Sequence, residues 1–428
     1  MSSNDWSEEK LGNVCDINSH TYSQKDDWSY IRYLDTGNIT ENKIDSIQYL
    51  DTKVDKIPSR AKRKVFKGDI IYSTVRPNQK HYGIIKETME NMLVSTGFAV
   101  INGKPDKIEN TFLYYYLTQQ HVVDLLHTIG EHSTSAYPSI KPSDIEGLDI
   151  SVPTLKEQKV IAATLSCLDD KIELNNRMNK TLEEMAQAIF KSWFVDFEPF
   201  QDGEFEDSEL GMIPKGWRVG NLDECIDFYN GYAFKSKELL DYEAVDGYRV
   251  FKMGHIKKGG GLNSDGTKSW ISKSDCKQLG KYVLKKGDLL MCMTDMKGNV
   301  ALLGHTALMN VDDVYIVNQR VGLLRVNNAF GIGFPYLYIL TNSRFFIEDL
   351  RGRANSGVQV NLSTSEIKGS KLVIAPEEVN TKLNNIVRPM FDKIFEIVQE
   401  NQILIVMRDT LLPKLMSGEI PVPIEEVQ

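Results

Sequence analysis

The sequence predicts a mixed α/β protein in which two similar domains are joined by two long antiparallel helices that form a coiled coil. Two observations carry this prediction. The 428-residue chain matches itself when it is shifted by a little over 210 residues, and each of the two copies ends in a long heptad pattern. Because repetition at a fixed offset marks a duplicated architecture, we expect an internal pseudo-twofold repeat.

Five pairs of segments carry the repeat, and they occur in the same order in both copies. They are residues 6–16 with 217–227, 32–39 with 249–256, 67–71 with 286–290, 143–147 with 365–369, and 170–172 with 392–394. The predicted order is domain 1 over 1–152, helix 1 over 153–197, an acidic linker over 198–213, domain 2 over 214–375, and helix 2 with a tail over 376–428.

Each domain is predicted to mix short strands with helices. Apolar runs at 69–73, 98–101 and 321–326 are bounded by glycine and proline, a pattern typical of strands. A helical stretch at 111–127 interrupts the strands of the first domain. This mixture indicates a mixed α/β class rather than an all-β or all-α domain.

The two predicted helices share a seam of apolar and small residues at steps of three and four. In the first helix the seam is Ile161, Leu165, Leu168, Ile172, Asn175, Asn179, Leu182, Ala186, Ile189 and Trp193. In the second it is Leu383, Val387, Met390, Ile394, Ile397, Asn401, Leu404, Arg408, Leu411 and Leu415. We expect the helices to pair with each other, with Asn179 and Asn401 fixing the register; the alternative is that each helix packs separately on its own domain.

The acidic net charge of the whole chain conceals a local excess of basic residues in each copy. The whole chain carries −9, but residues 214–375 carry +6. Residues 53–86 hold ten Lys or Arg against two acids, and residues 249–297 hold eleven against four. Two local basic blocks in an acidic chain suit a protein that meets nucleic acid at two places. Two lysine-rich solvated surfaces without a ligand would look the same.

Motif searches argue against catalysis by this chain. There is no GxxxxGK[ST] phosphate loop, no convincing GxGxxG, no HExxH, and no Asn/Asp-Pro-Pro-aromatic element for amino-group methylation of DNA. The five cysteines are scattered without a CxxC pair, so we expect neither a disulfide framework nor structural zinc. With no apolar run for a membrane span or a signal peptide, we expect a cytoplasmic protein.

Candidate DNA contacts are basic and hydrogen-bonding residues in and beside the basic blocks. Lys and Arg neutralise phosphates, while Arg, Asn and Gln can also read base edges. In the first domain the candidates are Arg60, Lys62, Arg63, Lys64, Ser73, Thr74, Arg76, Asn78, Lys80, His81 and Thr134. In the second they are Lys257, Lys258, Thr294, Lys297, Asn299, Arg320, Arg351 and Arg353.

Several motifs give the chain a resemblance to the specificity subunits of type I restriction–modification systems. They are VPTLKEQ at 152–158, LDDKI at 168–172, AIFKSWFVDF at 188–197, LGMIPKGW at 210–217 and LLPKLMSGEI at 411–420. One departure is that APEE at 375–378 introduces the second helix without the Glu-Gln pair of the first.

This resemblance implies two target-recognition domains that each read one half of a bipartite double-stranded DNA target. It implies helices that set the spacing and dock two modification subunits, which carry S-adenosylmethionine and methylate adenine. Restriction subunits that use ATP and Mg²⁺ can join such a complex, and this chain itself binds no cofactor. Two alternatives stay open: a self-contained DNA nuclease or methyltransferase, and a coiled-coil adaptor that binds only proteins.

Overall fold

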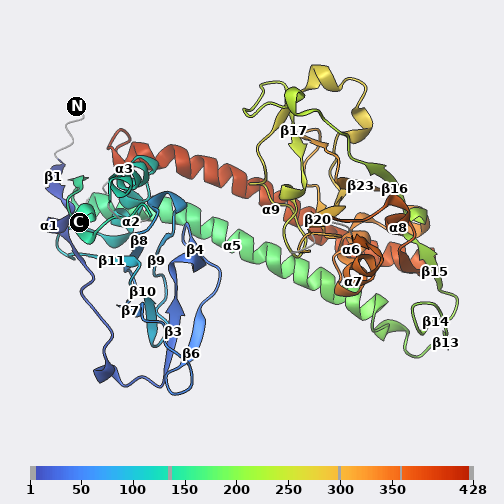
Figure 1. The fold of residues 1–428 in the computed structure, drawn as a ribbon, viewed down its shortest axis with the longest axis horizontal. Coiled ribbons are helices and arrows are strands. Elements are labelled where there is room, and N and C mark those ends of the chain that lie inside the picture. The colour runs from blue at the N-terminus through green and yellow to red at the C-terminus, as the bar shows by residue number, and fades with distance from the viewer. Residues whose placement is uncertain (1–5, 134–136, 297–299, 357–358, 424–428) are drawn as a thin grey trace. The chain divides into compact units, whose positions relative to one another are not determined.

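The computed structural model describes residues 6–133, 137–296, 300–356 and 359–423. The chain divides into two compact units, residues 1–174 together with 400–428, and residues 175–399. Each unit holds one mixed α/β domain and part of both long helices (Figure 1). The predicted fold class, two similar α/β domains joined by long helices, is confirmed.

The first unit contains two four-stranded sheets. In spatial order the first sheet is β2 (Cys15–Ile17), β11 (Phe98–Gly103), β8 (Ile70–Ser73) and β9 (Tyr82–Ile84), all antiparallel. The second is β6 (Gln48–Asp51), β3 (Tyr30–Leu34), β10 (Met92–Ser95) and β7 (Ala61–Lys64), in which β3 and β10 run parallel. Two short pairs complete the strands: β1 (Ser7–Lys10) with β12 (Asp149–Val152), and β4 (Ile39–Thr40) with β5 (Lys43–Ile44).

The second unit repeats the main four-stranded sheet and the parallel strand pair of the first. Its main sheet is β16 (Ile226–Asn230), β23 (Val321–Val326), β19 (Leu289–Cys292) and β21 (Thr306–Leu308). The other sheets are β18 (Trp270–Ser272), β17 (Gly247–Phe251) and β22 (Tyr315–Val317); β20 (Thr294–Met296), β25 (Gln359–Asn361) and β24 (Asn355–Ser356); β15 (Arg218–Asn221) with β26 (Lys371–Ile374); and β13 (Phe205–Glu206) with β14 (Ile213–Pro214). The parallel pair β17–β22 matches β3–β10, so the duplication read from the sequence extends to strand order.

Short helices occupy corresponding places in the two domains. They are α1 (Leu11–Val14), α2 (Asn110–Leu117), α3 (Gln120–Glu131) and α4 (Pro142–Glu146) in the first, and α6 (Phe334–Thr341), α7 (Arg344–Arg353) and α8 (Thr364–Lys368) in the second. Each domain is followed by one of the long helices, α5 (Leu155–Phe194) and α9 (Glu377–Met416). None of the described helices is both long enough and apolar enough to cross a membrane.

A Lys-Gly-Asp turn introduces the central strand of each domain. Gly68 and Gly287 both adopt a φ of 92°, which glycine reaches without a steric penalty. The carboxylates of Asp69 and Asp288 each accept the backbone N–H three residues earlier, at 2.8 Å. Strands β8 and β19, which follow these turns, are buried along their whole length. The repeated motif therefore fixes the same turn in both copies.

Helices α5 and α9 run antiparallel in the first unit. Arg408 Nη1 lies 2.9 Å from Asp169 Oδ1, and Lys171 Nζ lies 3.3 Å from Glu400 Oε1. Residue numbers therefore fall along α9 as they rise along α5. Arg408, a charged residue at a predicted seam position, is accommodated because it meets a carboxylate on the partner helix.

The predicted seam residues all lie on covered faces. Nine of the twenty are buried and eleven are partly buried; the buried ones are Ile161, Leu165, Asn175, Ala186, Leu383, Val387, Ile397, Asn401 and Leu415. Ile161 and Leu165 pack in the core of the first domain, where Leu415 and Met416 of α9 join them. Separate packing of each helix on its own domain is thus wrong for α9, whose last turn packs on the first domain.

Helix α9 contains two prolines, Pro389 and Pro413, and continues through both. An internal proline removes a backbone donor and usually breaks or kinks a helix. Val387 and Phe391, on either side of Pro389, are 1% and 2% exposed and belong to the core of the second unit. Burial of these side chains accounts for the persistence of the helix across the proline.

The acidic segment at 198–213 is more folded than its composition predicts. Strands β13 and β14 pair, and the ring of Phe200 lies 4.9 Å from that of Trp217. Lys215 and Lys371 form ion pairs with Glu204 and Glu209. The aromatic residues between the acids pack together, so the segment folds despite its high net negative charge.

Candidate nucleic-acid interface

The first basic block lies on and beside β7. Arg60 and Lys62 are exposed and form no ion pair with another described residue. Lys64 pairs with Asp26 instead, and the Nε atom of Arg63 is buried. Arg60 and Lys62 are therefore the cations of this block that are free to meet an anion.

The loop after β8 contains two hydroxyls that stabilise the loop itself. Ser73 is 1% exposed, and its Oγ donates to the carbonyl of Val75 at 2.9 Å. Thr74 Oγ1 donates to the carbonyl of Gly97 at 2.9 Å. The structure corrects the prediction of a DNA contact for Ser73, because the residue is buried and its hydroxyl is already bonded.

Farther along this loop the polar side chains reach the surface. Asn78 is exposed, and the half-buried Arg76 stacks over the ring of Tyr137 at 4.5 Å. Arg76 also adopts a φ of 48°, in the left-handed region that few residues other than glycine occupy. Both side chains remain candidates for base or phosphate contact.

Lys80 and His81 are engaged within the first domain. Lys80 Nζ lies 2.9 Å from Glu41 Oε1, and His81 Nδ1 lies 2.5 Å from the carbonyl oxygen of Ile39. The Lys80 charge is therefore compensated, which makes it a weaker candidate for a phosphate than Arg60 or Lys62.

In the second domain the predicted residues divide in the same way. Lys257, Lys258 and Arg320 are exposed. Thr294 lies within β20 and is 8% exposed, so the prediction of a DNA contact is corrected there. Three further predicted residues, Thr134, Lys297 and Asn299, lie outside the described residues.

Arg353 connects two helices of the second domain. Its Nη1 donates to the carbonyl of Glu366 at 2.7 Å, and its Nη2 donates to Asp349 at 2.6 Å and to Ser370 Oγ at 2.9 Å. These bonds tie the end of α7 to α8. Arg353 therefore positions these two helices, and its contact with DNA stays a prediction.

Arg351 and Asp295 fix the loop that precedes β21. Asp295 Oδ2 accepts the N–H groups of Leu302 at 2.6 Å and Leu303 at 3.2 Å. Arg351 donates from Nε to the carbonyl of Leu303 at 3.1 Å and from Nη2 to that of Ala301 at 3.2 Å. Asp295 therefore binds backbone N–H groups, and Arg351 binds backbone carbonyl groups, of the same short loop.

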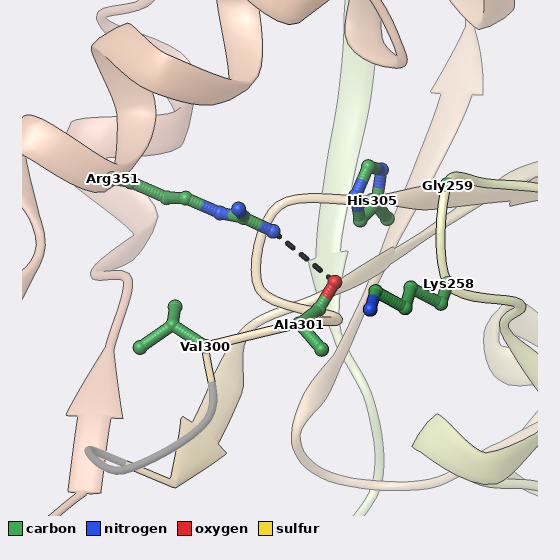
Figure 2. Close-up of a pocket in the computed structure, with 6 residues that line it drawn as sticks. All are labelled: Lys258, Gly259, Val300, Ala301, His305 and Arg351. Atoms are coloured by element: carbon green, nitrogen blue, oxygen red, sulfur yellow. Dashed lines mark hydrogen bonds between the residues drawn. The ribbon is translucent and has the colours of Figure 1, made fainter. Parts of the chain in front are cut away.

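Beside this loop lies a pocket of about 510 Å³. Its lining residues are Lys258, Gly259, Val300, Ala301, His305 and Arg351 (Figure 2). The close-up shows Lys258 and Arg351 extending toward the loop from different elements. Burial, reinforced by the charge of Arg351, lowers the pKa of His305 below its usual value of 6.5, so the imidazole is neutral at pH 7.

A second, smaller pocket of about 220 Å³ lies in the first domain next to Asp69. Burial raises the pKa of Asp69, while hydrogen bonds from the Phe66 N–H and the Asn102 amide oppose the rise. At the equivalent place in the second domain, Asp288 faces Arg325, whose Nη2 lies 2.6 Å from Asp288 Oδ2. The two domains therefore stabilise the same buried carboxylate differently.

His255 is a buried histidine that belongs to the core. It is 0% exposed, and its ring stacks on Phe251 at 5.1 Å. Burial, together with the nearby charge of Arg249, lowers its pKa to about 4. A neutral ring inside the core explains this shift without a catalytic role.

Among the described residues, no group of three or more His, Cys, Asp or Glu side chains is arranged to hold a metal ion. The cysteines present are unpaired; Cys15, Cys225, Cys276 and Cys292 are buried and Cys167 is exposed. Burial raises the pKa values of the four buried thiols, which disfavours a reactive thiolate.

Comparison with protein families decides what these duplicated domains are. Residues 3–184 and 214–405 each match the family model for the type I restriction modification DNA specificity domain. The two matches cover most of the chain and coincide with its two copies. The chain belongs to this family.

Curated relatives are named as type I restriction enzyme specificity subunits. The chain is 27% identical to the type I restriction enzyme HindI specificity subunit of Haemophilus influenzae, over 97% of this chain and 100% of that protein. It is 28% identical to the MjaIX specificity subunit of Methanocaldococcus jannaschii, over 83% of this chain and 78% of that protein. A crystal structure of the type I restriction–modification S subunit from M. genitalium shares the fold, with a TM-score of 0.58, 18% identity and coverage of 97% of both chains.

The predicted role as a non-catalytic DNA-specificity subunit is confirmed by this membership, and nothing in the comparisons favours a nuclease or a methyltransferase. The sequence candidates did not include His305, which lines the pocket of the second domain, or Asp295, which binds the loop beside it. His305 could have been found by comparing the two copies, because it precedes β21 just as the candidate His81 precedes β9. Asp295 gave no such signal, since its partners are backbone N–H groups.

Proposed function

We propose that this chain gives a type I restriction–modification complex its sequence specificity, with each domain reading one half of a bipartite double-stranded DNA target. The observation that carries the proposal is the presence of two DNA-specificity domains with the same strand order in one chain. Their surface loops differ in sequence and charge, as two readers of unlike half-sites require.

The exposed cations support contact with the DNA backbone. Arg60 and Lys62 in the first domain, and Lys257, Lys258 and Arg320 in the second, have no ion-pair partner in the described part of the chain. Cations of this kind yield affinity that falls with salt and carries no sequence information. Sequence is then read by a few side chains at base edges, for which Arg76 and Asn78 are candidates.

We further propose that α5 and α9 set the distance between the half-sites and dock two modification subunits. The apolar side chains of Ile403, Val406 and Met407 lie one turn apart on α9 and are 62%, 65% and 47% exposed. Exposed apolar residues at helical spacing are typical of a protein–protein contact. The modification subunits supply S-adenosylmethionine and methylate adenine, restriction subunits supply ATP and Mg²⁺ chemistry, and the complex acts in the cytoplasm.

Replacing one domain tests the reading of half-sites. The chain is expressed with its modification subunit in a methylation-free host, and methylated adenines are mapped by single-molecule sequencing. Exchange of residues 1–152 for the first domain of another family member should change one half of the motif and keep the other half and the gap. A change in both halves, or in neither, contradicts the assignment of one half-site to each domain.

The purified chain alone tests the catalytic alternative. Incubated with DNA and S-adenosylmethionine, or with DNA and Mg²⁺, it should neither methylate nor cleave. Activity that survives further purification and follows the chain through gel filtration would support a self-contained enzyme instead.

Substitutions on α9 test the docking of modification subunits. Ile403→Asp and Val406→Asp together should abolish co-purification of the modification subunit without lowering the melting temperature, since both side chains are exposed. Gln402→Asp, at an exposed position of the same helix, is the matched control and should co-purify normally. Normal co-purification of the double variant contradicts the proposed surface.

A further inference from the structure

The pocket of the second domain brings two cations and a neutral imidazole together from three separate elements. Lys258 lies in the turn after β17, His305 lies just before β21, and Arg351 lies in α7 (Figure 2). Among the described residues, none of the six that line the pocket is a carboxylate, and Asp295 is bonded to the N–H groups of Leu302 and Leu303. Lys258 and Arg351 are two cations that share a pocket with no carboxylate in its described lining, and this arrangement favours an anion between them.

The donors that remain free point to the same conclusion. Arg351 uses Nε and Nη2 for the loop carbonyls, and its Nη1 makes no bond within the described residues. Lys258 forms neither an ion pair nor a hydrogen bond there. The Nδ1 atom of His305 is buried and unpaired in the same part of the chain. An arginine and a lysine that both retain free donors are a common arrangement for a tetrahedral oxyanion.

The first domain has an acidic residue where the second domain has Lys258. The alignment of residues 32–39 with 249–256 puts Glu41 where the second domain has Lys258. Glu41 lies 2.9 Å from Lys80. His81 and His305 are equivalent as well. Each precedes the residue that pairs with the third residue of the buried strand, Tyr82 with Tyr72 and Thr306 with Met291.

The same comparison extends to Arg351. The offset that aligns α2 with α6 places His127 at the position of Arg351. His127 Nε2 lies 3.6 Å from Glu131. The first domain thus has two carboxylates around this position, whereas the lining of the second-domain pocket has none. The backbone differs as well, because the segment between β19 and β21 spans residues 293–305 and includes β20, whereas the segment between β8 and β9 spans residues 74–81.

We propose that the pocket formed by Lys258, His305 and Arg351 binds one phosphate of the DNA backbone, and that the first domain has no counterpart. The inference rests on the proposed function, because it assigns a ligand within one recognition domain. Lys258 and the free Nη1 of Arg351 donate to the phosphate oxygens, and the same guanidinium holds the loop at 301–303. The bound phosphate therefore sets the register of the duplex against that loop.

Lys258→Ala tests the proposal in the complete complex with its modification subunits. One lost phosphate contact should weaken target binding about 5- to 10-fold at 0.1 M salt and flatten the salt slope by about 0.9. The methylated motif should not change. Lys277→Ala, which removes an exposed lysine elsewhere in the second domain, should alter neither the affinity nor the slope.

Phosphate ethylation interference identifies the contact directly. On the wild-type complex, ethylation of one phosphate beside the second domain's half-site should impair binding, and Lys258→Ala should erase that single interference. Unchanged affinity, slope and interference pattern in Lys258→Ala overturns the proposal. A motif altered at one base overturns it too, because the pocket would then read a base.

Two further measurements separate the remaining outcomes. If inorganic phosphate raises the melting temperature of the DNA-free chain at micromolar concentration, and Lys258→Ala abolishes only this effect, the pocket binds free phosphate and the DNA assignment is overturned. If the wild-type complex shows no target preference at all, the proposed function fails rather than the pocket. Lys258→Glu, which installs the first domain's residue, should weaken binding more than Lys258→Ala.

Discussion

Replacing Arg325 by alanine is expected to destabilise the second domain by about 3 kcal/mol. Arg325 donates to Asp288 from Nε at 2.9 Å and from Nη2 at 2.6 Å, and to the carbonyl of Val283 at 3.1 Å. The Asp288 side chain is 4% exposed and that of Arg325 is 25% exposed. Removing one member of a buried pair costs roughly 3–5 kcal/mol, because a charge stays buried without its partner. The partial exposure of Arg325 places the expected loss at the lower end.

Urea unfolding measures the total loss, and hydrogen–deuterium exchange of β19 and β23 assigns it to the second domain. The control is Asn102→Ala, at the equivalent place in the first domain, where a single amide bonds to Asp69. That change should cost about 1 kcal/mol. A loss for Arg325→Ala no larger than for Asn102→Ala would refute the reasoning. Arg325→Met combined with Asp288→Asn should recover more than half of the loss, since no unpaired charge remains.

Four further predictions concern the helices, the DNA and acid stability. Deleting one heptad from each of α5 and α9 shortens them by about 10 Å and should reduce the tolerated gap by about three base pairs in methylation maps; an unchanged gap contradicts the spacer role. Lys62→Ala should weaken binding to all DNA sequences and lower the salt slope by about one; an effect at one base position alone contradicts a phosphate contact. Because the folded-state pKa of His255 is about 4 against an ordinary 6.5, its contribution is complete above pH 6.5 and lost as the pH falls toward 4. His255→Asn should therefore flatten that part of the stability curve, and an unaltered curve counts against it. Arg408→Leu should cost about 1–2 kcal/mol, and a double-mutant cycle with Asp169→Asn should show coupling, whose absence excludes a stabilising role for the pair.

The sequence was sufficient for the architecture because the features that specify it are periodic and repeated. The Lys-Gly-Asp turn recurs at Gly68 and Gly287 and marks the same strand start in both domains. The seam positions from Ile161 to Leu415 follow a period that only a helix satisfies, and none of the twenty is exposed in the structure. Family motifs in the helices then gave the functional class.

The individual DNA contacts were less accessible, because residue type does not reveal whether a donor is already used inside the fold. Ser73 and Arg353 belong to types that often contact DNA, yet both are committed to internal acceptors. Their partners include backbone carbonyls, which leave no trace in the sequence. The buried pair of Asp288 with Arg325 was missed for a related reason, since the two residues are distant along the chain.

The arrangement of the two cores has a consequence for the order of folding. The unit of residues 175–399 is one uninterrupted stretch, whereas the other unit includes Leu415 and Met416 in the core of the domain near the start of the chain. During synthesis, residues 175–399 are therefore complete before the first unit has received residues 400–428. The earliest-made domain must wait, with part of its apolar surface uncovered, until the last turn of α9 emerges. Long waits of this kind favour help from chaperones and make the final residues of α9 decisive for yield.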